Sequence, residues 1–75
     1  MDSQQISVAR RNLRLDGVQY ELAALQVNGG DYQATWHCSK CKVGGTSALT
    51  YPRSNAALDW AQNCAVMHEL QFHAY

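Results

Sequence analysis

The sequence predicts an α+β fold in which a three- to four-stranded antiparallel sheet packs against one C-terminal helix and zinc staples the two together. The first observation is that turn signals divide much of the chain into short stretches with strand-like alternation of apolar and polar residues. The second is a long stretch without Gly or Pro near the C-terminus, which is typical of a helix. The third is a Cys-x-x-Cys sequence between these two parts, with histidines near the end of the predicted helix.

Length and composition limit the class of protein. With 75 residues, the chain is expected to form one small domain over residues 1–75. A core in a chain this short supplies no more than about 3–5 kcal/mol, so a cross-link or a bound metal is expected. The chain is 47% hydrophobic and 16% charged, which is the composition of a folded protein. Its net charge of +0 argues against a protein whose main task is to hold DNA.

The first two strands are predicted on either side of Asp16-Gly17, within residues 6–27. An Asp-Gly pair tolerates the positive φ angles of a type I′ turn, which is the tight turn of many hairpins. In the second strand, alternate residues form one apolar face: Val18, Tyr20, Leu22 and Ala24.

The first of these strands has an irregular pattern. Apolar Ile6 and Val8 occupy even positions, whereas Leu13 and Leu15 occupy odd positions. Because side chains alternate between the two faces of a strand, this change of phase predicts a bulge or kink near residues 10–12.

Two further strands are predicted around the cysteines. The Asn-Gly-Gly-Asp turn at residues 28–31 introduces a short strand over residues 32–36, which leads into the Cys pair. Residues 43–47 contain two glycines and are expected to be flexible, and residues 48–51 are expected to add a short edge strand. Pro52 then stops strand pairing.

The helix is predicted over residues 55–72, with Ser54 as its N-cap. At about 100° per residue, one face carries the side chains that should pack on the sheet. These are Ala57, Ala61, Cys64, Ala65, His68 and Phe72. The opposite side carries the residues expected in solvent, which are Asp59, Gln62, Asn63 and Glu69.

The candidate metal ligands come from the Cys pair and from the helix. A Cys-x-x-Cys turn directs the sulfurs of Cys38 and Cys41 at one point, and backbone amides offset their charge. His68 and His73 have a His-x4-His spacing, which structural zinc sites use, and the last turn of a helix loosens easily enough to let both bind. This set of Cys38, Cys41, His68 and His73 is the expected one. Cys64 lies four residues before His68 on the same helix face, so it could replace His73 as the fourth ligand.

These motifs resemble a known class of protein. A strand ending in Cys-Ser-Lys-Cys, followed by a helix ending in His-Glu-Leu-Gln-Phe-His, resembles the two-cysteine, two-histidine ββα zinc finger over residues 32–75. The resemblance implies zinc as the cofactor. The spacing between Cys41 and His68 departs from the usual finger, in which about 12 residues intervene. DNA-reading positions therefore do not transfer to this chain, and a zinc-ribbon-like or treble-clef-like relative fits as well.

The expected function is that of a binding module and not of an enzyme. Four protein ligands leave no metal-bound water to activate, and a chain of this size has little room for a substrate pocket. A redox role is less favoured, because the glycines after the Cys pair make a poor helix start. Protein–protein interaction ranks first, because the exposed helix face is acidic. Nucleic-acid binding is the alternative, through basic residues elsewhere: Arg10, Arg11, Arg14, Lys40, Lys42 and Arg53.

The expected location is the cytoplasm. The polar N-terminus lacks the apolar region of a signal peptide, and no apolar run approaches the roughly 20 residues that span a bilayer. Three cysteines, an odd number, suit metal ligation better than a set of disulfides. We therefore expect an unidentified protein partner, no membrane association and no small-molecule substrate.

Overall fold

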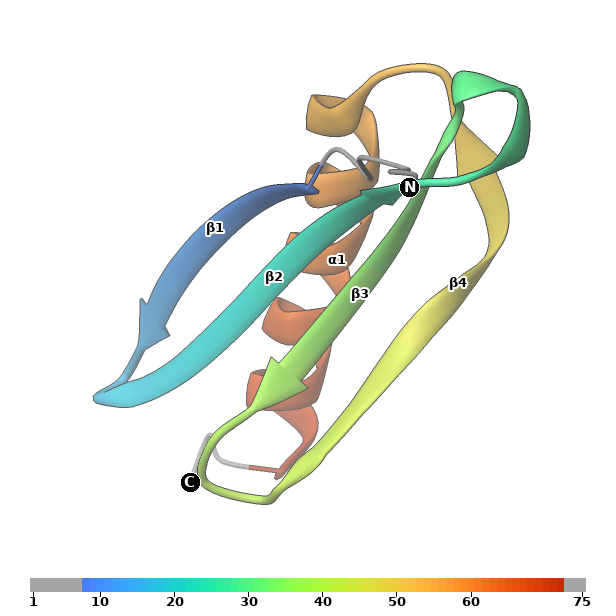
Figure 1. The fold of residues 1–75 in the computed structure, drawn as a ribbon. Coiled ribbons are helices and arrows are strands. Elements are labelled where there is room, and N and C mark those ends of the chain that lie inside the picture. Colours follow the sequence, from blue (N-terminus) through green and yellow to red (C-terminus); the bar gives the residue numbers. More distant parts are fainter. Residues whose placement is uncertain (1–7, 73–75) are drawn as a thin grey trace.

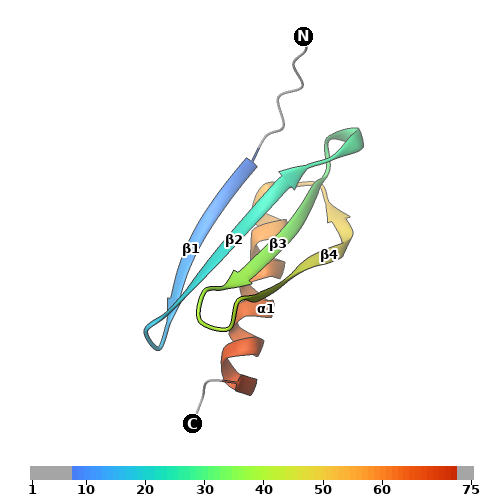
Figure 2. The same cartoon turned by 60° about the horizontal axis from the view of Figure 1, so that its bottom comes forward.

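The computed structural model describes residues 8–72 and contains one antiparallel sheet with a helix on one of its faces (Figures 1 and 2). The strands are β1 (Val8–Leu15), β2 (Val18–Gln26), β3 (Tyr32–Cys38) and β4 (Val43–Tyr51), and the helix is α1 (Ser54–Phe72). A single 3-10 turn, η1 (Asn28–Gly30), joins β2 to β3. The order in the sheet is β1-β2-β3-β4, so each strand pairs with its neighbour in the sequence. The predicted α+β fold class, with four strands, is confirmed.

The predicted turn between the first two strands is confirmed. Asp16 has a φ of 51° and Gly17 a φ of 82°, which is the left-handed region that a type I′ turn requires at both central residues. Leu15 pairs with Val18 across this turn. The turn therefore fixes the register of β1 against β2.

The predicted bulge in the first strand is wrong. The pairing of β1 with β2 runs without a shift from Val8 opposite Leu25 to the turn. The apolar pattern changes phase because Val8 lies on the exposed face of β1, with 40% exposure, whereas Leu13 and Leu15 lie on the helix-facing side.

Arg11 also lies on the helix-facing side, opposite Leu22, and interrupts its apolar residues. Its guanidinium Nη1 donates to Asp59 Oδ1 at 3.0 Å on α1, where an apolar side chain would otherwise pack. A long charged side chain thus breaks the sequence pattern and leaves the strand intact.

The prediction of a flexible segment after the cysteines is also wrong, because residues 43–47 belong to β4. The pairing of β4 with β3 shifts register between Gln33 and Thr35. The glycines of β4 permit a close approach to β3. A Cβ atom at Gly44 would overlap the backbone carbonyl oxygen of Trp36, and one at Gly45 would lie 2.8 Å from the indole Nε1 of Trp36. The glycines are therefore needed for strand pairing and packing here.

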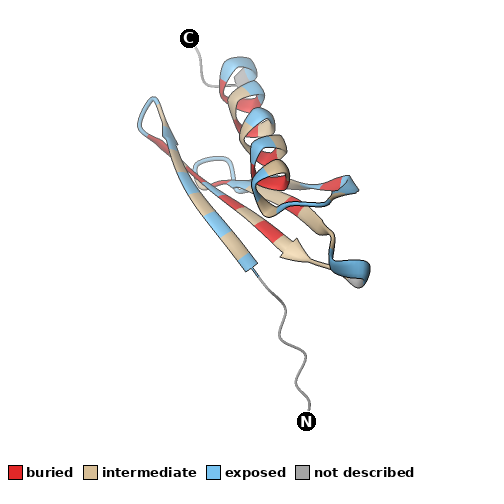
Figure 3. Cartoon of the chain, turned by 90° about the horizontal axis from the view of Figure 1, so that it is seen from above, coloured by how far each residue is buried: buried red, intermediate tan, exposed pale blue. Residues whose placement is uncertain are grey.

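The core lies between α1 and the two central strands (Figure 3). Its buried members are Val18, Tyr20, Leu22, Ala24, Ala34, Cys38, Ala57, Leu58, Ala61 and Ala65. Ala57, Ala61 and Ala65 confirm the predicted helix face and allow the helix backbone to lie close to the sheet. Within residues 8–72, no helix combines the length and apolar character needed to cross a membrane.

Candidate metal centre

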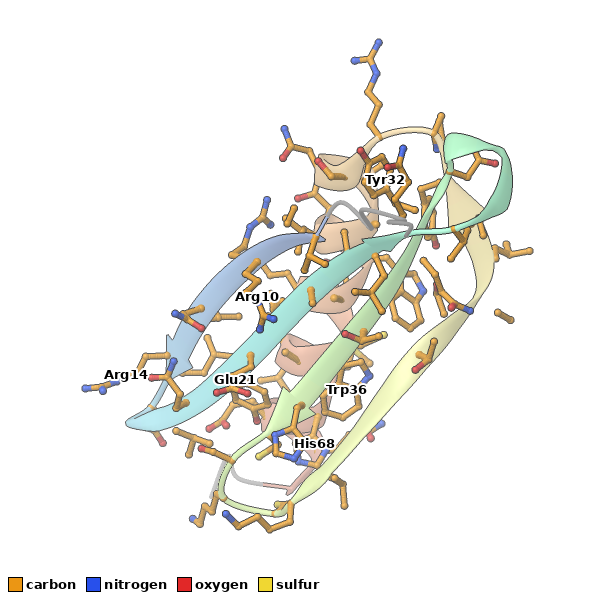
Figure 4. All side chains as sticks on the ribbon, in the orientation of Figure 1. Arg10, Arg14, Glu21, Tyr32, Trp36 and His68 are labelled. Carbon is orange, nitrogen blue, oxygen red and sulfur yellow. The ribbon has the colours of Figure 1, made fainter. Side chains whose placement is uncertain are left out.

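Three potential ligands converge at the end of the sheet where β3 turns into β4. One ligand atom each from Cys38, Cys41 and His68 lies within 4.8 Å of the others. Cys38 ends β3, Cys41 belongs to the turn that follows, and His68 belongs to the C-terminal part of α1. Figure 4 shows His68 behind the end of β3, on the helix-facing side of the sheet. Cys38 and His68 are buried, with 0% and 8% exposure, and Cys41 is exposed, so the cluster opens at the surface of the domain.

Backbone hydrogen bonds shape the turn that holds the two cysteines. The N–H of Lys42 donates to the carbonyl oxygen of Cys38 at 2.9 Å, and Lys42 itself has a φ of 61°. The N–H of Cys41 points at the Cys38 sulfur at 3.5 Å. Ser39 ties the turn to β2, because its N–H and its hydroxyl donate to the carbonyl oxygen of Gln19 at 3.1 and 2.8 Å. The turn therefore places hydrogen-bond donors around the Cys38 sulfur, whereas Cys41 is exposed to solvent.

These contacts separate the pKa values of the two thiols. Burial alone would raise the pKa of Cys38, but hydrogen bonds from the backbone of Cys41 and Lys40, and from the hydroxyl of Tyr20, outweigh it and lower the pKa of this thiol. Loss of hydration, followed by the hydrogen bond and charge of Cys38, raises the pKa of Cys41. Of the two thiols, Cys38 therefore loses its proton more readily, which favours it as a thiolate ligand.

Two aromatic rings pack against the imidazole of His68. The ring of Tyr20 meets it edge-on, with centroids 6.1 Å apart and an interplanar angle of 76°. The indole of Trp36 lies 5.3 Å away at 50°. His68 is consequently 8% exposed, and its ring is held at the end of the sheet that bears the cysteines.

The two candidates for a fourth ligand differ in position. Cys64 is half-buried and is not among the side chains that converge with Cys38, Cys41 and His68. Burial raises the pKa of the Cys64 thiol. The structure therefore does not assemble the alternative set that includes Cys64. His73 lies outside the described residues.

A groove runs along the flank of α1 beside Trp36. It has a volume of about 360 Å³. Its lining residues are Trp36, Trp60, Asn63, Cys64, Met67, His68 and Gln71. Cys64 faces this groove, and His68 lines both the groove and the ligand cluster, so the two sites adjoin.

Sequence reasoning missed one residue beside the cluster. Glu69 was expected in solvent, yet it is 7% exposed, because its Oε1 accepts a hydrogen bond of 2.9 Å from the Tyr20 hydroxyl. Burial, followed by this hydrogen bond, raises the pKa of Tyr20 above the usual range for a phenol. The residue in the sequence that could have indicated this contact is Tyr20, because a phenol on the core face of a strand needs a hydrogen-bond partner.

No family model, curated protein or solved structure matches this chain. The zinc-finger resemblance therefore rests on the ligand cluster and on the order of elements. β3, β4 and α1 follow one another in ββα order, with Cys38 at the end of β3 and Cys41 in the turn between the strands. The long spacing from Cys41 to His68 is taken up by the nine residues of β4 and by the late position of His68 in α1.

Proposed function

We propose that this chain is a structural zinc-binding module that mediates protein–protein interaction. The observation that supports a metal is the convergence of Cys38, Cys41 and His68 within 4.8 Å. Two thiolates and an imidazole are donors that favour zinc over magnesium or calcium, which prefer oxygen. The fourth ligand in this proposal is His73, so that all four positions are filled by protein and the metal has a structural role.

The hydrophobic core is small, so a bound zinc ion would add a large share of the stability of the domain. The largest fully buried side chains are Tyr20, Leu22 and Cys38, and most other core members are alanines. A zinc ion would tie the turn after β3 to the C-terminal part of α1. Structural zinc in finger peptides contributes about 10–16 kcal/mol in apparent terms, which is more than a core of this size supplies.

Zinc retention in single variants tests the ligand set. His73→Ala should release zinc during gel filtration against a moderate chelator, whereas Cys64→Ser should retain it as the wild type does. Zinc content per chain, measured by elemental analysis, provides the readout. Loss of zinc from Cys64→Ser with retention in His73→Ala would assign the fourth position to Cys64 and contradict the proposed set.

The groove on α1 supports a protein partner. Its lining includes an exposed apolar side chain of the helix, Met67, with 54% exposure. Exposed apolar groups around a groove are typical of a surface that receives an apolar anchor residue from another protein. The zinc clasp, in this proposal, holds the helix that forms this surface.

Selection of peptides from a displayed library against the zinc-loaded protein tests the interaction. The selected peptides should share a large apolar residue, and Met67→Glu should abolish their binding. Arg10→Glu, on the uncovered face of the sheet, is the matched control and should bind as the wild type does. Peptides that bind Met67→Glu unchanged would exclude the groove as the docking surface.

A different observation supports nucleic-acid binding as the alternative function. Arg10 and Arg14 are exposed on β1 and lie on the sheet face away from α1 (Figure 4). Lys40 and Lys42 are exposed in the turn between β3 and β4. Arg11, which the sequence placed among these basic residues, instead forms an ion pair with Asp59 on α1. Binding of mixed DNA and RNA across a salt series distinguishes the two functions, since affinity that falls steeply with salt would favour phosphate contacts.

A further inference from the structure

A buried carboxylate lies beside the ligand cluster. Glu69 is 7% exposed, and within residues 8–72 its Oε2 is buried with no hydrogen-bond partner. A buried carboxylate with one unsatisfied oxygen costs free energy, and an apolar residue of similar size would pack here at lower cost. Glu69 immediately follows His68 on α1, which suggests that its role concerns that ligand.

Tyr20 connects this carboxylate to both parts of the cluster. It is fully buried and lies opposite Cys38 in the pairing of β2 with β3. Its ring packs edge-on against His68, and its hydroxyl donates to Glu69. One side chain from the sheet therefore contacts a ligand on β3, a ligand on α1 and the residue next to that ligand.

We propose that Tyr20 and Glu69 are positioning residues of the metal centre, whose hydrogen bond sets the rotation of the last turns of α1 so that His68 meets Cys38 and Cys41 before metal binds. This inference rests on the proposed zinc site. At the other end of the helix, Arg11 contacts Asp59 and Gln62, so α1 is also tied to the sheet near its start. The Tyr20–Glu69 bond supplies the tie at the ligand end, where an error in helix rotation would move His68 away from the sulfurs.

Substitutions at Glu69 separate a hydrogen bond from a charge. Glutamine retains an amide oxygen that can accept a hydrogen bond from the Tyr20 hydroxyl, whereas alanine has no acceptor in its side chain. If positioning through the hydrogen bond is the role, Glu69→Gln should bind zinc nearly as tightly as the wild type. Glu69→Ala and Tyr20→Phe should both weaken zinc binding by about 10- to 100-fold, the usual effect of losing an outer partner of a ligand.

Competition with a chromophoric chelator measures these affinities in the full chain. The double variant Tyr20→Phe/Glu69→Ala should bind zinc no more weakly than Tyr20→Phe alone, because Tyr20→Phe already removes the bond to Glu69 together with the interaction of the hydroxyl with Cys38. Glu21→Ala is the matched control, since Glu21 neighbours Tyr20 in β2 but is exposed and lies on the other face of the sheet. Its affinity for zinc should equal that of the wild type.

The visible spectrum of bound Co²⁺ distinguishes positioning from loss of stability alone. Glu69→Ala should alter the ligand-field bands, because His68 would be misplaced while the Tyr20 hydroxyl beside Cys38 is retained. Leu22→Val, which removes core packing in the same strand without touching a ligand, should leave the bands unchanged. Glu69→Ala with wild-type zinc affinity and spectrum would overturn the inference, as would a Glu69→Gln as weak as Glu69→Ala. A wild-type protein that binds no zinc would instead overturn the proposed function.

Discussion

The three thiols of this domain have different surroundings. Cys38 is buried among hydrogen-bond donors that lower its pKa, and Cys41 is exposed in the turn beside it. Cys64 lies one helical turn before His68, facing an apolar groove, and burial raises the pKa of its thiol. Donors around a sulfur favour the thiolate that metals bind, whereas burial without donors favours the neutral thiol. Burial without such donors is the reason we propose Cys64 as a packing residue and His73 as the fourth ligand.

Replacement of Cys64 by Ala should reduce the loss of stability at alkaline pH. Because burial raises the pKa of the Cys64 thiol, the folded protein keeps this proton at pH values where the unfolded chain, with a thiol pKa of about 8.5, has released it. The folded state then binds more protons than the unfolded state. The stabilisation is therefore complete below the unfolded pKa and is lost as the pH rises through the folded one.

Thermal unfolding of the zinc-loaded wild type and Cys64→Ala from about pH 7 to about pH 10 measures this difference. The wild type should lose stability more steeply than the variant above the pKa of an ordinary thiol. Parallel curves for the two proteins would contradict a raised pKa at Cys64.

Two residues show where patterns in the sequence mislead. Arg11 interrupts the apolar alternation of β1, and Glu69 sits on a helix face that periodicity assigns to solvent. Each is explained by a partner far away in the chain: Arg11 reaches Asp59, 48 residues on, and Glu69 receives a hydrogen bond from Tyr20, 49 residues before it. Hydrophobic periodicity is a property of one helix or strand at a time, so it cannot predict a polar side chain whose partner lies on another element.

At the scale of elements, β4 depends on its glycines. A turn after the Cys pair and two adjacent glycines predict flexibility when only local propensity is considered. In the structure, Gly44 lies opposite His37 and Gly45 lies opposite Trp36. The absence of side chains there lets β4 approach β3 and lets the indole of Trp36 lie over the strand. Tertiary packing thus overrides the local preference of these residues.

Substitution of Gly44 by Ala should lower the free energy of unfolding by about 1–3 kcal/mol, the usual cost of overpacking. The added Cβ would overlap the backbone carbonyl oxygen of Trp36, which cannot move unless β3 moves with it. Gly45→Ala meets the indole side chain of the same residue, which can rotate, so its cost should be smaller. Urea titration of both zinc-loaded variants compares their free energies of unfolding. A Gly44→Ala variant that is as stable as the wild type would contradict the close pairing of β4 with β3.

At the scale of the whole molecule, the fold class could be predicted because its topology is local. Each strand pairs with the next one along the chain, and the turns at Asp16-Gly17 and at residues 28–31 are visible in the sequence. The candidate metal centre was partly predictable, since Cys38, Cys41 and His68 do converge. Its surroundings were not, because the contacts of Tyr20 with His68 and Glu69 depend on how the helix crosses the sheet.

We propose that a zinc ion holds the turn after β3 to α1 and that folding of the domain depends on this ion. The most direct test measures zinc content and folding together, on protein purified without added zinc. Native mass spectrometry should show one zinc ion per chain, and circular dichroism should show loss of α1 when a strong chelator removes the metal and its return when zinc is restored. A protein that is free of metal and keeps the same circular dichroism spectrum and thermal stability would contradict the account.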